Sequence, residues 1–196
     1  MVCTVNTARR RATYEDLLKV PDLLIAEIID GELIASPRPA SPHARATSVI
    51  GRVLDPFDQH SGGPDGPPGG WWILFEPELH CGADVLVPDL AGWRRERMPI
   101  LANVPYFELA PDWVCEVVSP TTGRLDRVRK MPIYAREQVG RVWLVDPLMR
   151  TVEVYRLQGQ QWVLLGTHGG AERVRAEPFE AIELDISRWW LEEPTP

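Results

Sequence analysis

The sequence predicts a mixed α/β fold of the α+β kind, with one mixed, partly antiparallel β-sheet. Short segments rich in β-branched and aromatic residues crowd the middle of the chain. Turn signals separate several of these segments. Segments with helical periodicity lie before and after this β-rich middle. This order of elements favours a sheet with flanking helices rather than a regular alternation of strand and helix.

Length and composition indicate one globular domain. The chain has 196 residues, 44% of them hydrophobic and 25% charged, which is enough to bury a core and too apolar for a disordered chain. We expect a flexible N-terminal tail over residues 1–12 and a single domain over residues 13–196. The formal net charge of -7 excludes a protein that coats nucleic acid through bulk positive charge.

Cysteine usage and hydropathy predict a soluble, cytoplasmic protein. Cys3, Cys81 and Cys115 are odd in number and form no CxxC pair, so a disulfide framework or a zinc cluster is not indicated. The N-terminus carries no apolar stretch of signal-peptide length. No apolar run approaches the roughly 20 residues that a bilayer-spanning helix needs, so no membrane partner is expected.

The N-terminal third shows three local signals. Thr13 to Asp16 is an acidic variant of a capping box and predicts a short helix through Lys19. Asp30-Gly31 predicts a hairpin between residues 24–29 and 32–35. Ser41-Pro42 predicts a helix start, and apolar residues at helical spacing continue to Phe57.

The rest of the chain predicts mainly strands. Pro132 interrupts the one long helical pattern in this part. The expected segments are, in order, a loop at 61–70, strands at 71–79 and 84–93, a loop-like insert at 94–111, a strand at 113–118, a helix at 124–138, a strand at 141–145, a hairpin of 151–157 with 161–166, and a strand-like segment at 179–186 before the aromatic residues Trp189 and Trp190.

Two acidic residues stand in apolar strand patterns. Asp89 lies in VLVPDLAGW and Glu116 lies in WVCEVVSPTT. If these strands pair, the two carboxylates can point to one face, where they repel each other and are poorly solvated. A divalent cation resolves both problems, and oxygen ligands of this kind suit Mg²⁺ or Mn²⁺. Phosphodiester hydrolysis is the chemistry that uses such a site.

The same residues allow structural explanations. Asp89 after Pro88 is also typical of a turn. Glu116 can be held by an ion pair with Arg127 or Lys130 instead of a metal. Cys115 has no marked histidine partner and is interpreted as a small core residue rather than a nucleophile.

An ordered set of motifs resembles the Uma-two family of restriction-type endonucleases, which belongs to the PD-(D/E)XK nuclease superfamily. The resemblance extends from about Thr13 to Trp190 and rests on the order and spacing of the motifs together. Its parts are Glu27 to Leu33, Ser41-Pro42-His43, Pro88-Asp89, Glu116 to Pro120, Asp126, Lys130, Tyr134, Trp143 to Pro147, and Leu184-Asp185-Ile186.

The resemblance implies a restriction-endonuclease-like core, with an N-terminal hairpin and a C-terminal β-hairpin extension, and roles for named residues. Asp89 and Glu116 would bind Mg²⁺ or Mn²⁺ together with the backbone carbonyl of Val117. The superfamily places a lysine two residues after the glutamate, but this chain has Val118 there. A lysine displaced to the next helix, Lys130, would take its place.

Two further expectations concern that helix and the N-terminal hairpin. Pro132 either kinks the helix near Lys130 or marks its start, in which case Lys130 lies just before it. Glu27 resembles a family acid that would complete the catalytic set through water or a second metal.

Three groups of arginines are candidates for contacts with phosphate: Arg9 to Arg11, Arg94 with Arg95 and Arg97, and Arg124 with Arg127 and Arg129. The third group flanks the expected site, so Arg124 and Arg127 are the preferred phosphate ligands. His43 is a third candidate, either as a phosphate ligand or as a proton shuttle.

The leading hypothesis is a Mg²⁺-dependent DNA endonuclease of restriction type. One alternative is a catalytically silent module that keeps the nuclease fold and binds DNA or protein, which Val118 and the acidic net charge favour. Another is a phosphodiesterase that acts on RNA or small nucleotides. The trailing hairpin and the aromatic tail are expected to form a homodimer interface, since two-fold symmetry suits an enzyme that cuts both strands.

Overall fold

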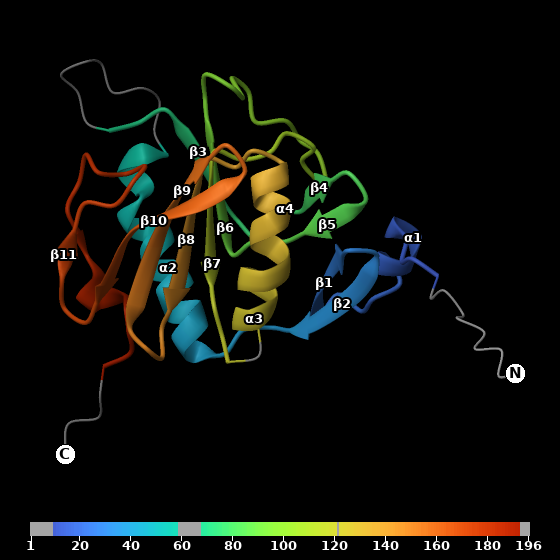
Figure 1. Ribbon diagram of the computed structural model, residues 1–196, viewed down its shortest axis with the longest axis horizontal. Helices are drawn as coiled ribbons and strands as arrows, with labels where there is room; N and C mark the ends of the chain where they lie inside the picture. The colour runs from blue at the N-terminus through green and yellow to red at the C-terminus, as the bar shows by residue number, and fades with distance from the viewer. Residues whose placement is uncertain (1–9, 59–67, 121, 193–196) are drawn as a thin grey trace, which may run out of the picture.

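The computed structural model describes residues 10–58, 68–120 and 122–192. It contains a six-stranded sheet, a four-stranded sheet and a two-stranded ribbon (Figure 1). The mixed α/β fold that the sequence predicts is confirmed. Most of the expected tail and most of the loop at 61–70 lie outside the described residues.

The six-stranded sheet forms the centre of the fold. Its strand order is β10-β9-β8-β7-β6-β3, and only β7 and β8 pair in parallel. The strands are β3 (Trp71–Phe75), β6 (Leu90–Arg94), β7 (Trp113–Val117), β8 (Arg141–Asp146), β9 (Thr151–Gln158) and β10 (Gln161–Gly169). The parallel pair is joined by the helical segment that follows β7, as a parallel connection requires.

The four-stranded sheet has the order β2-β1-β5-β4. It is built from β1 (Leu24–Ile29), β2 (Glu32–Pro37), β4 (Leu79–Cys81) and β5 (Asp84–Leu86), and helix α1 (Tyr14–Leu17) packs on it. The predicted N-terminal hairpin is confirmed, and both turn residues, Asp30 and Gly31, have positive φ as a type I′ turn demands. The capping box is also present, because Asp16 accepts a hydrogen bond of 3.0 Å from the backbone of Thr13.

Helices cover the two faces of the six-stranded sheet, with α2 on one face and α4 on the other (Figure 1). The helical segments are α2 (Ser41–Val53), the 3₁₀ turn η1 (Asp55–Phe57), α3 (Gly123–Leu125), the π-helical turn η2 (Asp126–Lys130), α4 (Met131–Arg136) and the 3₁₀ turn η3 (Ile186–Trp189). Across the described ranges, no helix is long and apolar enough to cross a membrane.

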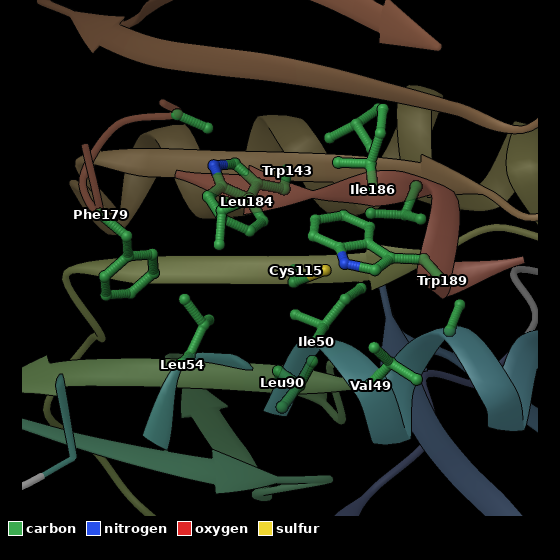
Figure 2. Packing of buried hydrophobic residues seen from close by; sticks show 14 of the residues in the cluster. Val49, Ile50, Leu54, Leu90, Cys115, Trp143, Phe179, Leu184, Ile186 and Trp189 are labelled. Carbon is green, nitrogen blue, oxygen red and sulfur yellow. The ribbon is translucent and has the colours of Figure 1, made fainter. Parts of the chain in front are cut away.

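The larger core cluster lies between α2 and the six-stranded sheet. Val49 and Ile50 of α2 meet Cys115 of β7 and Trp143 of β8 there (Figure 2). The C-terminal segment closes this core from the side, with β11 (Arg173–Val174), β12 (Leu184–Asp185) and η3. Burial on this face fixes α2, and through it the start of α2 at Ser41.

Two long strands expected from the sequence are each broken. Residues 71–79 divide between β3 and β4, and residues 84–93 divide between β5 and β6. The halves belong to different sheets, because the chain turns at Glu76, which has φ 46°, and leaves strand geometry at residues 87–89. Pro88 has no N–H for a strand ladder, which accounts for the second break. Asp89 therefore lies where the two sheets meet.

Three other expectations are wrong in detail. The helix expected through Phe57 ends at Val53, and Pro56 is accommodated in the 3₁₀ turn that follows. The segment 179–186 contributes only the two-residue strand β12. Trp189 and Trp190 are buried in the core of their own chain, so the aromatic tail does not supply a dimer interface. A homodimer through the β9–β10 hairpin stays a prediction.

Trp189 tests the contribution of the C-terminal segment to the core. Its side chain is fully buried and faces Trp143 with ring centroids 6.0 Å apart. We expect Trp189→Ala to lower the free energy of unfolding by about 3–5 kcal/mol in urea titrations, because a large cavity is created. Leu191→Ala, at a side chain that is 44% exposed, serves as the control and should change stability by less than about 0.5 kcal/mol. Equal effects of the two substitutions would contradict this packing.

Candidate active site

A pocket of about 370 Å³ lies where β1, the end of β2, the end of β7 and residues 87–89 meet the start of α2 and the turn η2. The two sheets and both helical layers contribute to it. Its charged and polar lining residues are Glu27, Ser36, Arg38, His43, Asp89, Glu116, Ser119, Thr122, Asp126 and Lys130.

Asp89, directly before β6, and Glu116, on the neighbouring strand β7, both line this pocket. The antiparallel register pairs Leu90 with Cys115, and continuing it by one residue places Asp89 opposite Glu116. The backbone N–H of Val117 donates a 2.7 Å hydrogen bond to Asp89 Oδ2. Since the N–H and C=O of one strand residue point to the same side, the Val117 carbonyl lies on the Asp89 side of β7.

Lys130 places its ammonium among three carboxylates. Its Nζ lies 2.8 Å from Glu27 Oε1, 3.3 Å from Glu116 Oε1 and 3.6 Å from Asp126 Oδ1. Each of these four residues is at most 4% exposed. Glu116 is therefore ion-paired with Lys130, one of the two partners that the sequence suggested. The other, Arg127, pairs with Glu153 at 3.2 Å instead.

Hydrogen bonds orient the two glutamates of this cluster. The Tyr134 hydroxyl donates to Glu116 Oε1 at 2.5 Å. The backbone N–H of Val87, just after β5, donates to Glu27 Oε1 at 2.8 Å. Glu27 thus accepts hydrogen bonds from the Val87 backbone and from Lys130. These two contacts connect the four-stranded sheet to the helix after β7.

The helix that carries Lys130 runs through Pro132 without a break. The helix does not start at Pro132, which was one of the two alternatives expected from the sequence, because α3, η2 and α4 form one continuous segment from Gly123 to Arg136. The other alternative, a local distortion of the helix near Lys130, takes the form of the π-helical turn η2. Pro132 lacks the N–H that an α-helix would use and its ring would crowd the carbonyl of Val128. The wider π-helical turn directly before Pro132 absorbs both problems. Lys130 therefore stands on a fixed part of the helix.

His43 lies in the first turn of α2 and reaches the same pocket. Its Nε2 is 3.1 Å from Asp89 Oδ1, and its Nδ1 is buried without a hydrogen-bond partner among the described protein atoms. The other two predicted phosphate ligands are not brought there. Arg124 and Arg127 are exposed and do not line the pocket. Arg38, which the sequence analysis does not single out, lines it instead.

The chain matches the model of a known family over residues 11–187. The family is Uma2, described as "Putative restriction endonuclease". The chain belongs to the Uma2 family. The structure is also similar to a crystal structure from Anabaena variabilis described as a "putative nuclease belonging to DUF820", with a TM-score of 0.71 and 24% sequence identity over 91% of this chain and 97% of that one. That likeness shows a shared fold. Comparison with curated proteins finds no match.

Two further residues of this Uma2 chain join the site. Asp126 and Tyr134 resemble family residues, but the sequence gives no role for either. With Lys130 they recur at intervals of four, and all three are buried toward Glu116. A run of Asp, Lys and Tyr at this spacing is the signal that would have found them, because residues four apart share one helical face.

The oxygen atoms at the pocket fit a small divalent cation. Within the described parts of the chain, no three His, Cys, Asp or Glu side chains form a metal-binding group. Mg²⁺ does not require one, since proteins usually hold it by one or two carboxylates while water and substrate complete its coordination. Asp89, Glu116 and the Val117 carbonyl are a donor set of that kind.

The cluster contains more carboxylates than positively charged groups. Burial, and then the carboxylates of Asp126, Asp89 and Glu27, raise the pKa of Glu116 well above its ordinary value of 4.5, although Lys130 opposes the shift. Burial also raises the pKa of Asp126. Burial alone would lower the pKa of Lys130, but its carboxylate neighbours raise it well above the ordinary value. The cluster therefore retains protons, which a bound cation would displace.

The raised pKa of Glu116 predicts a pH-dependent stability. Between pH 4.5 and the higher pKa of the folded state, the native protein binds more protons than the unfolded chain. The free energy of unfolding should therefore fall in EDTA as pH rises above the ordinary pKa of 4.5 toward the raised pKa of the folded state. We expect Glu116→Gln to flatten this slope in urea titrations. Asp126 contributes with the same sign, so part of the slope remains.

Glu183→Gln provides the control for that experiment. Glu183 is an exposed carboxylate that pairs with Arg173 far from the pocket lining. Its variant should follow the wild-type slope. Parallel slopes for wild type and Glu116→Gln would contradict the assignment of this pH dependence to the buried cluster.

Proposed function

We propose that this protein hydrolyses phosphodiester bonds of nucleic acid with Mg²⁺ or Mn²⁺, as a DNA endonuclease of restriction type. The observation that carries the proposal is the convergence of Asp89, Glu116 and Lys130 on one pocket. Membership of the Uma2 family supports the same reaction class.

Asp89, Glu116 and the carbonyl of Val117 would hold the cation. When bound, such a cation polarises the phosphate, lowers the pKa of water and stabilises the leaving oxygen. The Val117 N–H and His43 hold the Asp89 carboxylate from two sides, at 2.7 Å and 3.1 Å, and so fix its orientation. Tyr134 does the same for Glu116. These hydrogen bonds therefore fix the orientation of the two carboxylates that would bind the cation.

Lys130 supplies the positive charge of the site. A fixed ammonium beside Glu116 favours negative charge on a phosphate in its transition state and can orient an attacking water. Glu27 and Asp126 hold Lys130 in place, so it performs this role from the helix although Val118 occupies the usual position on the strand. His43, beside Asp89, is available to contact a phosphate oxygen.

Cleavage of supercoiled plasmid and labelled DNA in Mg²⁺ or Mn²⁺ tests the reaction. We expect nicked or linear products from the wild type, none in EDTA, and a loss of at least about a hundredfold in rate for Glu116→Ala. Glu183→Gln should cut at the wild-type rate. Activity that survives Glu116→Ala would remove Glu116 from the mechanism.

Calorimetry with Mn²⁺ separates the enzyme from a catalytically silent module of the same fold. Binding that disappears in Asp89→Asn supports the metal site. A folded wild type that binds no Mn²⁺ would favour the silent module. Products from RNA or small nucleotides but none from DNA would favour the phosphodiesterase alternative.

Lys130 and Lys19 form a matched pair for the role of the ammonium, because they are the two lysines of the chain. We expect Lys130→Met to reduce cleavage by at least about a hundredfold. It should also lower the free energy of unfolding by about 3–5 kcal/mol, because three buried carboxylates lose their counter-charge. Lys19 is 72% exposed, and Lys19→Met should leave both properties unchanged.

Circular dichroism shows whether Lys130→Met is folded. If it is not, Lys130→Arg keeps the charge and should fold, but with lower stability than the wild type because the planar guanidinium fits three surrounding carboxylates less well than an ammonium does. A folded Lys130→Met protein with wild-type activity would exclude Lys130 from the reaction.

A further inference from the structure

We infer that the pocket accepts an unpaired nucleic-acid strand in preference to a duplex. This inference rests on the proposed function and concerns the form of the substrate. It follows from the depth of the reactive groups, the apolar residues of the pocket lining and the internal pairing of the basic side chains.

The reactive groups lie deep in a small pocket. Glu116 and Lys130 are 3% and 4% exposed, at the inner end of a cavity of about 370 Å³. That volume is at the lower end of the range for small-molecule pockets and has room for about one nucleotide. A duplex is stiff over roughly 150 base pairs and keeps its phosphates on the outside of a wide cylinder. An unpaired strand can rotate about its backbone bonds and lower one phosphate into the pocket.

Apolar side chains form about half of the pocket lining. Leu148, in the turn between β8 and β9, lines the pocket with a side chain that is 58% exposed. Five further apolar residues that line the pocket are prolines, namely Pro37, Pro39, Pro42, Pro120 and Pro147. Such a surface suits the faces of unstacked bases and sugars, which a duplex hides and a single strand exposes.

The basic side chains at the pocket are already paired. Among the described residues that line it, only Arg38 and Lys130 are permanently positive. Arg38 pairs with Glu76 at 2.7 Å, and Lys130 is surrounded by carboxylates.

Several of the arginines predicted to contact DNA are also paired within the protein. Arg97 pairs with Asp112 at 2.8 Å, and Arg129 pairs with Glu32 at 2.8 Å. Proteins that hold a duplex typically make several such contacts to its phosphates. The proposed preference therefore does not depend on long-range charge, and binding should depend only weakly on salt.

Binding and cleavage of oligonucleotides of one sequence test the inference. The probes are fluorescein-labelled single-stranded DNA, the same DNA as a blunt duplex, and single-stranded RNA. Binding is measured with wild type in EDTA and with Glu116→Gln in Mn²⁺, and cleavage is measured with wild type in Mn²⁺. We expect single strands to bind and to be cut at least tenfold better than the duplex. The DNA and RNA probes show which unpaired strand is preferred.

The outcomes separate this inference from the proposed function. A duplex bound and cut as well as the single strand would overturn the strand preference and leave the hydrolytic function standing. A clear preference for single strands in binding, without hydrolysis of any probe, would overturn the hydrolytic function and support the preference. Equal binding of all probes without hydrolysis would overturn both.

Leu148 and Met149 form a matched pair at the rim. Both side chains are exposed, at 58% and 72%, but only Leu148 is among the pocket-lining residues. We expect Leu148→Ala to weaken binding of single-stranded DNA roughly fivefold, because apolar contact with the strand is lost. Met149→Ala should bind as the wild type does. Thermal melts verify that both variants are folded, and equal affinities of the two would contradict the proposed contact.

Discussion

The candidate site depends on the burial of one ammonium among three carboxylates. Lys130, Glu27, Glu116 and Asp126 are each almost fully removed from water, which costs several kcal/mol for an isolated ion. Only mutual contact offsets this cost, so the four residues are stable together and unfavourable singly. Because they come from β1, β7 and η2, the requirement fixes how the hairpin, the central sheet and the helix meet.

The same requirement explains why the chain changes sheets beside the site. Because the strand is broken at residues 87–89, the N–H of Val87 is free to donate a hydrogen bond to Glu27. The carboxylate of Asp89 is likewise free to accept a hydrogen bond from the N–H of Val117. A continuous strand would have used those backbone groups in its ladder. The four carboxylates that face the pocket exceed the single ammonium in charge, and this imbalance makes the site receptive to a further cation.

Local patterns predicted much of the fold but not the junction on which the site depends. The type I′ turn at Asp30-Gly31 and the start of α2 at Ser41 follow from local chemistry. A partner for Glu116 was predicted because a buried acid requires one, with Lys130 and Arg127 as the two alternatives to a metal, and Lys130 is the residue that pairs with it. The break at Pro88 and the π-helical turn before Pro132 were not predicted, since tertiary packing decides whether a proline ends an element or is absorbed by it. The role of Asp126 was missed although its spacing of four residues from Lys130 indicates a shared helical face.

The displaced lysine, the π-helical turn and Pro132 form one solution to a geometric problem. Lys130 must reach over the end of β7, where Val118 leaves space on the Glu116 face but provides no charge. The chain has 21 basic residues, and all but Lys19 and Lys130 are arginine. A compact ammonium can be surrounded by three carboxylates, whereas the planar guanidinium of arginine needs a flat, forked arrangement of acceptors. The widened turn places that ammonium 2.8 Å from Glu27 and 3.3 Å from Glu116, so the lysine serves both sheets from a single helical position.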